Sequence, residues 1–322
     1  MRAAVIDRYG PPDVVQIREV PKPVPADNEI LVRITATTVN SGDARVRALR
    51  VPRGMTLMLR LTMGWNGPKQ KVQGFEAAGV VEQVGAQVTQ FKPGDRVVGS
   101  HGFKFGLHAE YATFTEADAL VPIPEGMSDT DAVSLLFGGA TARYFLAAGK
   151  LKAGDRLLIN GASGAVGVMS IQLGKHLGAE VTAVCSSKNE DLVRSLGADH
   201  VIAYDREDFT RSGQTYDVIM DTHGNAPYAR IRHMLAPEGR FLMVIGDLLQ
   251  EIQSKFQKQV VGSGGNEAEA VNKTAYSHLL DLAQQGVLKP VIDKVFPFDQ
   301  IAEAHRLVDS GHKVGSVIVT VP

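Results

Sequence analysis

Residues 157–180, LLINGASGAVGVMSIQLGKHLGAE, decide the fold of this chain. A short apolar run ends at Asn160, and a glycine-containing turn follows at 161–167. Apolar residues then recur at helical spacing: Val166, Met169, Leu173 and Leu177. A buried strand, a glycine turn and an amphipathic helix in this order predict the first strand–helix unit of a dinucleotide-binding sheet.

The turn matches the G-x-G-x-x-G fingerprint with one change, because Ala162 stands at its first position, ahead of Gly164 and Gly167. The second glycine lets the backbone approach a pyrophosphate, and the third lets the helix pack closely on the strand. Backbone N–H groups at the start of the helix then face the anion. We therefore predict cofactor contacts from these residues: Ala162, Ser163, Gly164, Ala165, Val166 and Gly167. In the alternative interpretation the glycines serve only a tight turn.

The rest of the chain has two kinds of pattern. Residues 1–124 contain β-rich runs, such as 29–40 and 74–85, separated by Gly and Pro. From Ser128, a predicted helix N-cap, strands and helices alternate, and the last residues return to β-rich runs. We therefore predict an α/β protein with a β domain at 1–124, completed by 288–322, and a doubly wound parallel-sheet Rossmann domain at 125–287.

Composition excludes several classes of protein. The 322 residues are 44% hydrophobic and 21% charged, and the net charge of −1 gives no electrostatic footprint for nucleic acid. No apolar run approaches the ~20 residues of a membrane span, and MRAAVIDRYG lacks the apolar core of a signal peptide. The single cysteine, Cys185, excludes an internal disulfide and a multi-thiolate zinc site. We expect a cytoplasmic enzyme or binding protein without a nucleic-acid partner or a membrane span.

The end of the second Rossmann strand predicts which dinucleotide binds. In VTAVCSSKNE (181–190) two serines and a lysine follow Cys185, and no carboxylate stands where an NAD site places one for the ribose 2′-OH. Ser186 and Lys188 suit a 2′-phosphate through charge-assisted hydrogen bonds. In the alternative, Lys188 only occupies the first turn of the next helix. The absent carboxylate favours NADPH.

With these features in place, the chain resembles the medium-chain dehydrogenase/reductase superfamily, specifically its zinc-free quinone-oxidoreductase-like branch. The resemblance covers nearly the whole chain. It rests on GFEAAGVVEQVG, FKPGDRVVG, HAEYATF, LINGASGAVG, SLGADHVIAY and GVLKPVIDKVFPFDQIAEAHRLVDSGHKVGSVIV. It implies a GroES-like β domain carrying substrate contacts, a Rossmann domain, a cleft between them and a homodimer.

The resemblance also implies roles for particular residues. Asn40 and Asp43 in VNSGD match the family's V-N-x-x-D segment at the base of the substrate cleft, and Thr141 in GGATA matches a threonine near the nicotinamide. Tyr204 matches a tyrosine along the 2′-phosphate. Backbone contacts after the fourth and fifth Rossmann strands are implied at Gly224, Val244, Ile245 and Gly246. Each residue has a structural alternative, which for Asp43 is the capping of a turn.

The metal ligands of zinc-dependent relatives are missing. Their Gly-His-Glu triplet is replaced by Gly74, Phe75 and Glu76, and their cysteine ligands have no counterpart. We therefore predict no metal. Because zinc would supply Lewis-acid help, we expect an acceptor that is already electrophilic: a small apolar or conjugated molecule, either a quinone or an alkene conjugated to a carbonyl. Positioning beside the nicotinamide then carries most of the catalysis.

Two other functions remain open: a non-catalytic NADPH-binding redox sensor or scaffold and, less favoured, an NADP-linked alcohol dehydrogenase.

One segment departs from the family, because ARVRALRVPRG (44–54) has arginines where quinone reductases often have tyrosines. The following MTLMLRLTMGW (55–65) allows three interpretations: a pliable lid or cleft wall over a bulky apolar substrate, buried packing, or a basic amphipathic surface helix. We favour the lid or cleft wall.

Overall fold

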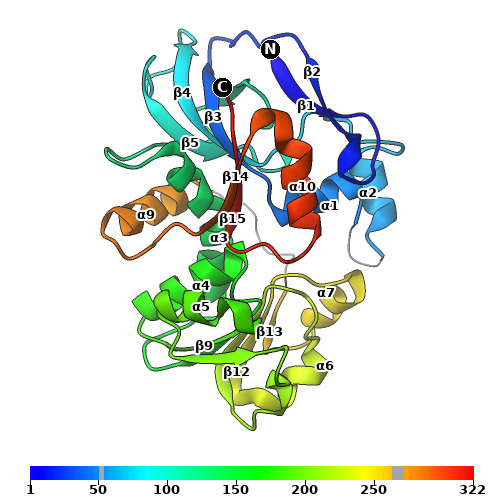
Figure 1. Ribbon diagram of the computed structural model, residues 1–322, viewed down its shortest axis with the longest axis vertical. Coiled ribbons are helices and arrows are strands. Elements are labelled where there is room, and N and C mark those ends of the chain that lie inside the picture. Colours follow the sequence, from blue (N-terminus) through cyan, green and yellow to red (C-terminus); the bar gives the residue numbers. More distant parts are fainter. Residues whose placement is uncertain (51–53, 263–271) are drawn as a thin grey trace.

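The structure is a computed structural model that describes residues 1–50, 54–262 and 272–322, and two sheets dominate it (Figure 1). In the described part of the chain, seven strands form the first sheet, in the order β14-β15-β3-β4-β5-β7 with β6 beside β3. Its strands are β3 (Glu29–Thr38), β4 (Glu76–Val84), β5 (Arg96–Ser100), β6 (Tyr111–Thr115), β7 (Ala119–Pro122), β14 (Ile292–Pro297) and β15 (Ser316–Thr320). A separate antiparallel pair, β1 (Arg2–Ile6) and β2 (Val15–Glu19), lies at the N-terminus.

The C-terminal strands return to this first sheet. β15 pairs antiparallel with β3, with Ile318 opposite Thr38, and β14 pairs parallel with β15. The crossover between β14 and β15 contains α10 (Ile301–Asp309), which buries Ile301, Ala304 and Val308 at helical spacing. The β-rich residues near the C-terminus therefore complete the first sheet, as expected. The exact domain boundaries stay predictions.

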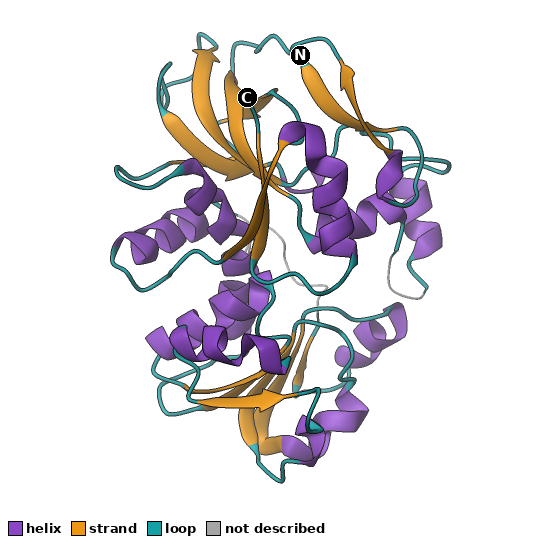
Figure 2. Ribbon diagram, in the orientation of Figure 1, coloured by secondary structure: helices purple, strands orange, loops and turns teal. Residues whose placement is uncertain are grey.

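The second sheet is parallel throughout its described strands, in the order β10-β9-β8-β11-β12-β13. Its strands are β8 (Arg156–Asn160), β9 (Glu180–Cys185), β10 (His200–Ala203), β11 (Tyr216–Asp221), β12 (Leu235–Met243) and β13 (Val260–Val261). Helices α4 (Ala165–His176), α5 (Glu190–Ser195), α6 (Tyr228–Ile231) and α7 (Leu248–Ser254) belong to this half of the molecule (Figure 2). The strand order reverses between β8 and β11, which opens a crevice at their carboxyl ends. The predicted α/β fold with a doubly wound sheet is confirmed.

Helix α4 forms where the apolar spacing predicted it. Val166, Met169 and Leu173 are buried, but Leu177 is the C-cap and is 42% exposed. The helix ends there because Gly178 has a φ of 81°, a left-handed conformation that only glycine adopts without strain.

One long helix, α3 (Asp129–Ala148), joins the two halves (Figure 1). As predicted, Ser128 is its N-cap, and the Oγ atom accepts the N–H of Asp131 at 3.0 Å. The helix packs on α4 and on β3 and β4, while α9 (Lys273–Gln284) covers α3 and β7. A continuous buried cluster therefore combines Ala36 and Ala78 of the first sheet with Leu157 of the second. This shared core holds the two halves together, so a cavity between them has fixed walls.

Two further helices follow β3: α1 (Ser41–Ala48) and α2 (Thr56–Met63). The residues of α2 are all described, and none of them is buried. Among the described residues, every helix is too short or too polar to cross a bilayer.

Candidate functional site

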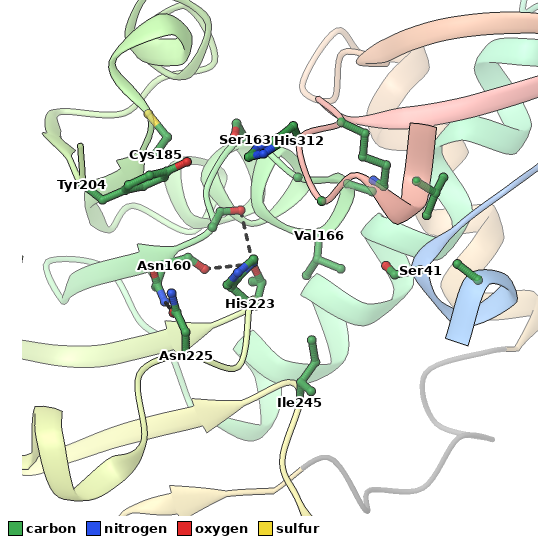
Figure 3. Close-up of a pocket in the computed structure, with 18 of the residues that line it drawn as sticks. Ser41, Asn160, Ser163, Val166, Cys185, Tyr204, His223, Asn225, Ile245 and His312 are labelled. Carbon is green, nitrogen blue, oxygen red and sulfur yellow. Dashed lines mark hydrogen bonds between the residues drawn. The ribbon is translucent and has the colours of Figure 1, made fainter. Parts of the chain in front are cut away.

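A cavity of about 860 Å³ lies between the two halves of the molecule. Ser41 comes from α1, Asn160 ends β8, and His312 comes from the loop before β15; all three line the cavity (Figure 3). Figure 3 shows Ser41 on one side of the cavity and Asn160 and Tyr204 on the other, with His312 beside Ser163 between them. Its volume is typical of ligand pockets, and its position is the point where the strand order reverses.

The glycine turn has the geometry that the fingerprint predicts. Gly161 has a φ of 82°, and its N–H and that of Ala162 donate to the carbonyl of Val184 at 3.1 and 3.0 Å. A Cβ atom on Gly167 would lie 2.4 Å from the carbonyl oxygen of Gly161, so only glycine permits this approach of helix to strand. A Cβ atom on Gly164 would meet only that same oxygen, at 3.5 Å. The second glycine thus leaves free space at the cavity wall.

The start of α4 suits an anion. Its N-cap is Gly164, which has no side chain to cap the helix, and Ala165 and Val166 line the cavity directly after it. Unsatisfied N–H groups and the positive end of the helix dipole therefore meet at the cavity wall. These residues fit the pyrophosphate of a dinucleotide.

A buried hydrogen-bond network fixes the ends of β8 and β11. Asn160 Nδ2 donates to Asp221 Oδ1 at 2.9 Å, and the same carboxylate accepts the N–H groups of Gly224 and Ala226 at 2.9 and 3.0 Å. Gly224 has a φ of 81°, which this turn requires. His223 and Asn225, on either side of Gly224, line the cavity (Figure 3). The network therefore fixes the part of the cavity wall where we predicted a backbone contact from Gly224.

The loop after β12 forms the adjoining wall. Of the three predicted residues there, Ile245 lines the cavity. Val244 donates its N–H to the carbonyl of Asp221, and Gly246 is buried. A Cβ atom on Gly224 would lie 3.2 Å from Ile245, so the two loops lie against each other.

The adenosine end of the crevice holds a carboxylate that the sequence reasoning missed. Tyr204 lines the cavity and is 54% exposed, while its contact with a 2′-phosphate stays a prediction. Ser186 is half-buried, and Lys188 is exposed outside the lining. Asp205 accepts the N–H of Ser187 at 2.9 Å and its Oγ–H at 2.6 Å. These hydrogen bonds lower the pKa of Asp205, which keeps the carboxylate charged.

We expected no carboxylate at the end of the second Rossmann strand. The residues that follow β9 contain none there, but Asp205, from the end of the neighbouring strand, lies at the same place in the structure. Asp205 follows the neighbouring strand, β10, and parallel pairing brings it beside Ser187. The residue directly after Tyr204 was the available signal in the sequence.

Asn40 and Asp43 form a capping box at the start of α1. Asn40 Oδ1 accepts the N–H groups of Gly42 and Asp43 at 2.8 and 3.1 Å, and Asp43 Oδ2 accepts the N–H of Asn40 at 2.9 Å. Both side chains are buried beneath Ser41 and lie outside the cavity lining. Burial raises the pKa of the Asp43 carboxyl, and His108 nearby lowers it. In this structure Asp43 therefore caps a turn, which was the structural alternative to a role at the substrate. A direct contact of Asn40 or Asp43 with substrate stays a prediction.

Thr141 lies on α3, one helical turn after Phe137. Its Oγ atom donates to the Phe137 carbonyl at 2.7 Å, and the Phe137 side chain lines the cavity. In this rotamer the Thr141 hydroxyl accepts hydrogen bonds from other groups but does not donate to them. Its predicted place beside the nicotinamide stays a prediction.

The structure thus brings only part of the predicted set to the cavity: Ser163, Gly164, Ala165, Val166, Tyr204 and Ile245. The remaining predicted residues are outside the cavity lining: Asn40, Asp43, Thr141, Ala162, Gly167, Ser186, Lys188, Gly224, Val244 and Gly246.

Lys313 is a lining residue that the sequence reasoning missed. Its Nζ atom donates to the carbonyl of Gly315 at 2.6 Å, and the N–H of Gly315 donates to Ser163 at 2.9 Å. Gly315 also forms a β-bridge with Gly164. Burial lowers the pKa of the Lys313 amine to about 8, partly opposed by Asp293. The sequence carries no spacing signal for this contact, because residues 313–315 reach the glycine turn only through the return of the chain to the first sheet.

Metal-binding side chains are scattered in this region. Among the described residues, no group of three or more His, Cys, Asp or Glu side chains is placed to hold a metal ion. Burial raises the pKa of the Cys185 thiol, which lines the cavity, to about 11, so this group is protonated and inert at neutral pH. Independence from zinc stays a prediction.

Comparisons with known proteins cover both halves of the chain. A family model of the alcohol dehydrogenase GroES-like domain matches residues 26–125, which confirms that part of the fold prediction, and a model of zinc-binding dehydrogenases matches residues 196–319. The chain is 30% identical to the chloroplastic quinone-oxidoreductase QR1 of Triphysaria versicolor, over 99% of this chain and 98% of that protein. It is 29% identical to the chloroplastic NADPH-dependent alkenal/one oxidoreductase of Arabidopsis thaliana, over 99% of this chain and 79% of that protein.

Solved structures are similar along the full length. The quinone oxidoreductase from Coxiella burnetii superposes with a TM-score of 0.88 at 25% identity, covering 100% of this chain and 99% of the other. The CurK enoyl reductase superposes with a TM-score of 0.86 at 26% identity, with the same coverage.

Proposed function

The chain belongs to the medium-chain dehydrogenase/reductase superfamily, in its quinone-oxidoreductase-like branch, and we propose that it is an oxidoreductase that transfers hydride from NADPH to a quinone or to an alkene conjugated to a carbonyl. The observation that carries the proposal is the cavity between the two halves, which meets the free space beside Gly164 at one wall and residues of α1 at another. The names of the relatives, which act on quinones and alkenal/ones, support the same class of acceptor.

The nicotinamide of the bound cofactor supplies the hydride. The residues around the glycine turn hold the dinucleotide: Gly164 leaves room for the pyrophosphate, the N–H groups of Ala165 and Val166 face it, and the Lys313 ammonium lies beside the same turn. A dinucleotide held there would leave the α1 side of the cavity to the acceptor.

The acceptor end of the cavity has both apolar and charged side chains. Ala44, Phe137 and Val308 line it, and Ser41 adds a hydroxyl at the start of α1. Arg45 and Arg50 add two cations to the same wall. Apolar walls exclude water and position a flat conjugated molecule, and this positioning carries a large share of hydride transfer to an acceptor that is already electrophilic. The proposal keeps Asn40, Asp43 and Thr141 as residues of this end, acting from behind the lining.

For the cofactor we propose NADPH in preference to NADH. Tyr204, Ser186 and Lys188 support a 2′-phosphate site, whereas the charged Asp205 opposes a phosphate there. Because Lys188 attracts the 2′-phosphate and Asp205 repels it, we expect NADPH to bind only about tenfold more tightly than NADH.

Three other expectations belong to the proposal: the chain forms a homodimer, acts in the cytoplasm and works without zinc. Light scattering measures the oligomeric state directly. A non-catalytic NADPH-binding sensor remains the second candidate function, because the site contains no side chain whose acid–base chemistry the hydride transfer strictly requires. An NADP-linked alcohol dehydrogenase without zinc is the third and least favoured.

The deciding experiment is steady-state oxidation of NADPH with a panel of quinones, conjugated enones, simple ketones and alcohols, with and without a chelator. We expect turnover with quinones and enones, almost none with simple ketones, and no effect of the chelator. If NADPH binds but no acceptor is reduced, the sensor function replaces the proposal. Alcohol oxidation that a chelator abolishes would instead establish the zinc-dependent chemistry.

A further inference from the structure

An exposed apolar surface flanks the cavity, and the proposed hydride transfer does not explain why it is apolar. We call it the rim surface and define it by side chains of α2 and the turn after it and by side chains of α7 and the turn after it: Leu57, Met58, Leu61 and Trp65, with Leu249, Ile252 and Phe256. Their exposure ranges from 47% for Ile252 to 84% for Phe256. Soluble monomers rarely expose so many large apolar side chains together, so this surface calls for a partner.

The rim surface extends outward from the cavity wall. Gly54, just before α2, lies against the first residue of α7, because a Cβ atom on Gly54 would be 3.0 Å from Leu248 Cβ. In sequence, α2 follows Arg45 and Arg50 and α7 follows Ile245, and all three of these residues line the cavity. Figure 1 shows α2 and α7 on the same side of the molecule, one from each half. None of residues 55–65 lines the cavity and no residue of α2 is buried, so the cleft-wall and buried-packing interpretations are wrong and α2 is a surface helix. A lid function stays a prediction.

The segment that contains α2 has cations but no carboxylates of its own. Residues 44–75 contain seven Lys and Arg residues and no Asp or Glu. Three of these cations pair with carboxylates from other segments: Arg47 and Arg50 with Asp309, and Lys71 with Asp7. Arg60 lies over the Trp65 ring and donates to its carbonyl, and Lys69 donates to the last carbonyls of α2. In the described part of the chain, neither cation is paired with a carboxylate. On the α7 side Lys255 and Lys258 are exposed around Phe256, and Glu251 is the one carboxylate among residues 248–258.

We propose that the rim surface docks on an anionic lipid surface, with the apolar side chains inserted at the headgroup boundary and the cations facing the lipid phosphates. Short helices with Leu, Met and Trp on an exposed face and flanking Lys and Arg bind bilayers in this way. A second copy of the chain is a poorer occupant, because a twofold interface centred on α2 would bring two cationic segments without carboxylates against each other. Docking would bring the cavity to the phase in which apolar quinones and enones accumulate; this benefit, but not the docking itself, rests on the proposed function.

The test is flotation of the full-length protein with vesicles of phosphatidylcholine, alone or mixed with phosphatidylglycerol, in the absence of any acceptor. The variants are Leu61→Glu and Phe256→Glu, one on each half of the molecule. Val24→Glu is the matched control, because Val24 is 83% exposed outside the rim surface. NADPH binding is measured on every variant, which separates failure of docking from failure of the fold or of the proposed function.

We expect the parent and Val24→Glu to float with the anionic vesicles and both rim variants to lose about tenfold or more in vesicle affinity, because each loses the burial of one large apolar side chain. Raised salt should weaken binding of the parent. The proposal is overturned if the parent binds neither kind of vesicle, or if the rim variants float as the parent does. It is also overturned if Leu61→Glu converts an oligomer to a monomer while no vesicle binding is seen, since the surface then joins copies of the chain.

Discussion

Replacing Gly164 with alanine should weaken NADPH binding while leaving the fold intact. Gly164 has φ −75° and ψ 172°, which alanine adopts freely, and the new methyl group would meet only Gly161 O at 3.5 Å. Alanine makes the unfolded chain less flexible, which stabilises the fold, but it is a poorer N-cap than glycine, which destabilises it. The two effects oppose each other, so the free energy of unfolding should change by less than about 1 kcal/mol. The methyl group occupies the space that the pyrophosphate needs, however. Overpacking of ~1–3 kcal/mol corresponds to a loss of roughly 5- to 150-fold in affinity.

Gly167→Ala is the matched comparison in the same turn. Its methyl group would lie 2.4 Å from Gly161 O and 2.6 Å from Ala162 Cα, backbone atoms that cannot move aside without shifting the strand. We expect a loss of stability near the upper end of ~1–3 kcal/mol. Calorimetric titration with NADPH and urea denaturation of both variants test the pair. The reasoning is refuted if Gly164→Ala binds NADPH as tightly as the parent, or if Gly167→Ala unfolds at the same urea concentration as the parent.

Four other outcomes are expected. NADPH should bind about tenfold more tightly than NADH, and by calorimetry Asp205→Asn should widen this gap and Lys188→Ala should narrow it; equal parent affinities would contradict the 2′-phosphate site. Because the pKa of Lys313 is about 8 when folded and 10.5 in the unfolded chain, the unfolded state binds more protons between these values, so stability should rise from pH 8 to 10.5 in urea denaturation, and Lys313→Met should flatten that rise. Elemental analysis should find well under one zinc per chain; stoichiometric zinc would overturn the proposed chemistry. In stopped-flow measurements, Thr141→Ala and Asn40→Ala should slow hydride transfer more than they weaken NADPH binding, by at most ~10²-fold, and parent rates in both would remove them from the substrate site.

The local elements of the Rossmann half were predictable from the residues alone. The strand at 156–160, the turn after it and the N-cap at Ser128 appear where expected. Each depends on backbone conformations and side-chain periods that lie within about twenty residues of sequence. Gly164 and Gly167 also have distinct roles that follow from their positions in one turn.

Two interpretations from the sequence differ from what the structure shows. Asn40 and Asp43 were assigned to substrate by motif, yet their first use is the capping box of α1, a short-range pattern (N-x-x-D) that the sequence already displayed. The cleft-wall interpretation of residues 55–65 is wrong for a different reason, because apolar spacing indicates that a helix has an apolar face but not what lies opposite it.

The sequence by itself determined the fold class, the glycine turn and the kind of ligand that the turn accepts, because these depend on contacts between near neighbours in the chain. Tertiary structure alone decided that Asp205 stands beside Ser187, that Lys313 reaches the glycine turn and that α2 and α7 share one exposed surface. These contacts join residues from 18 to about 190 positions apart. Only strand order and the return of the chain to the first sheet bring them together, and no local pattern encodes that order.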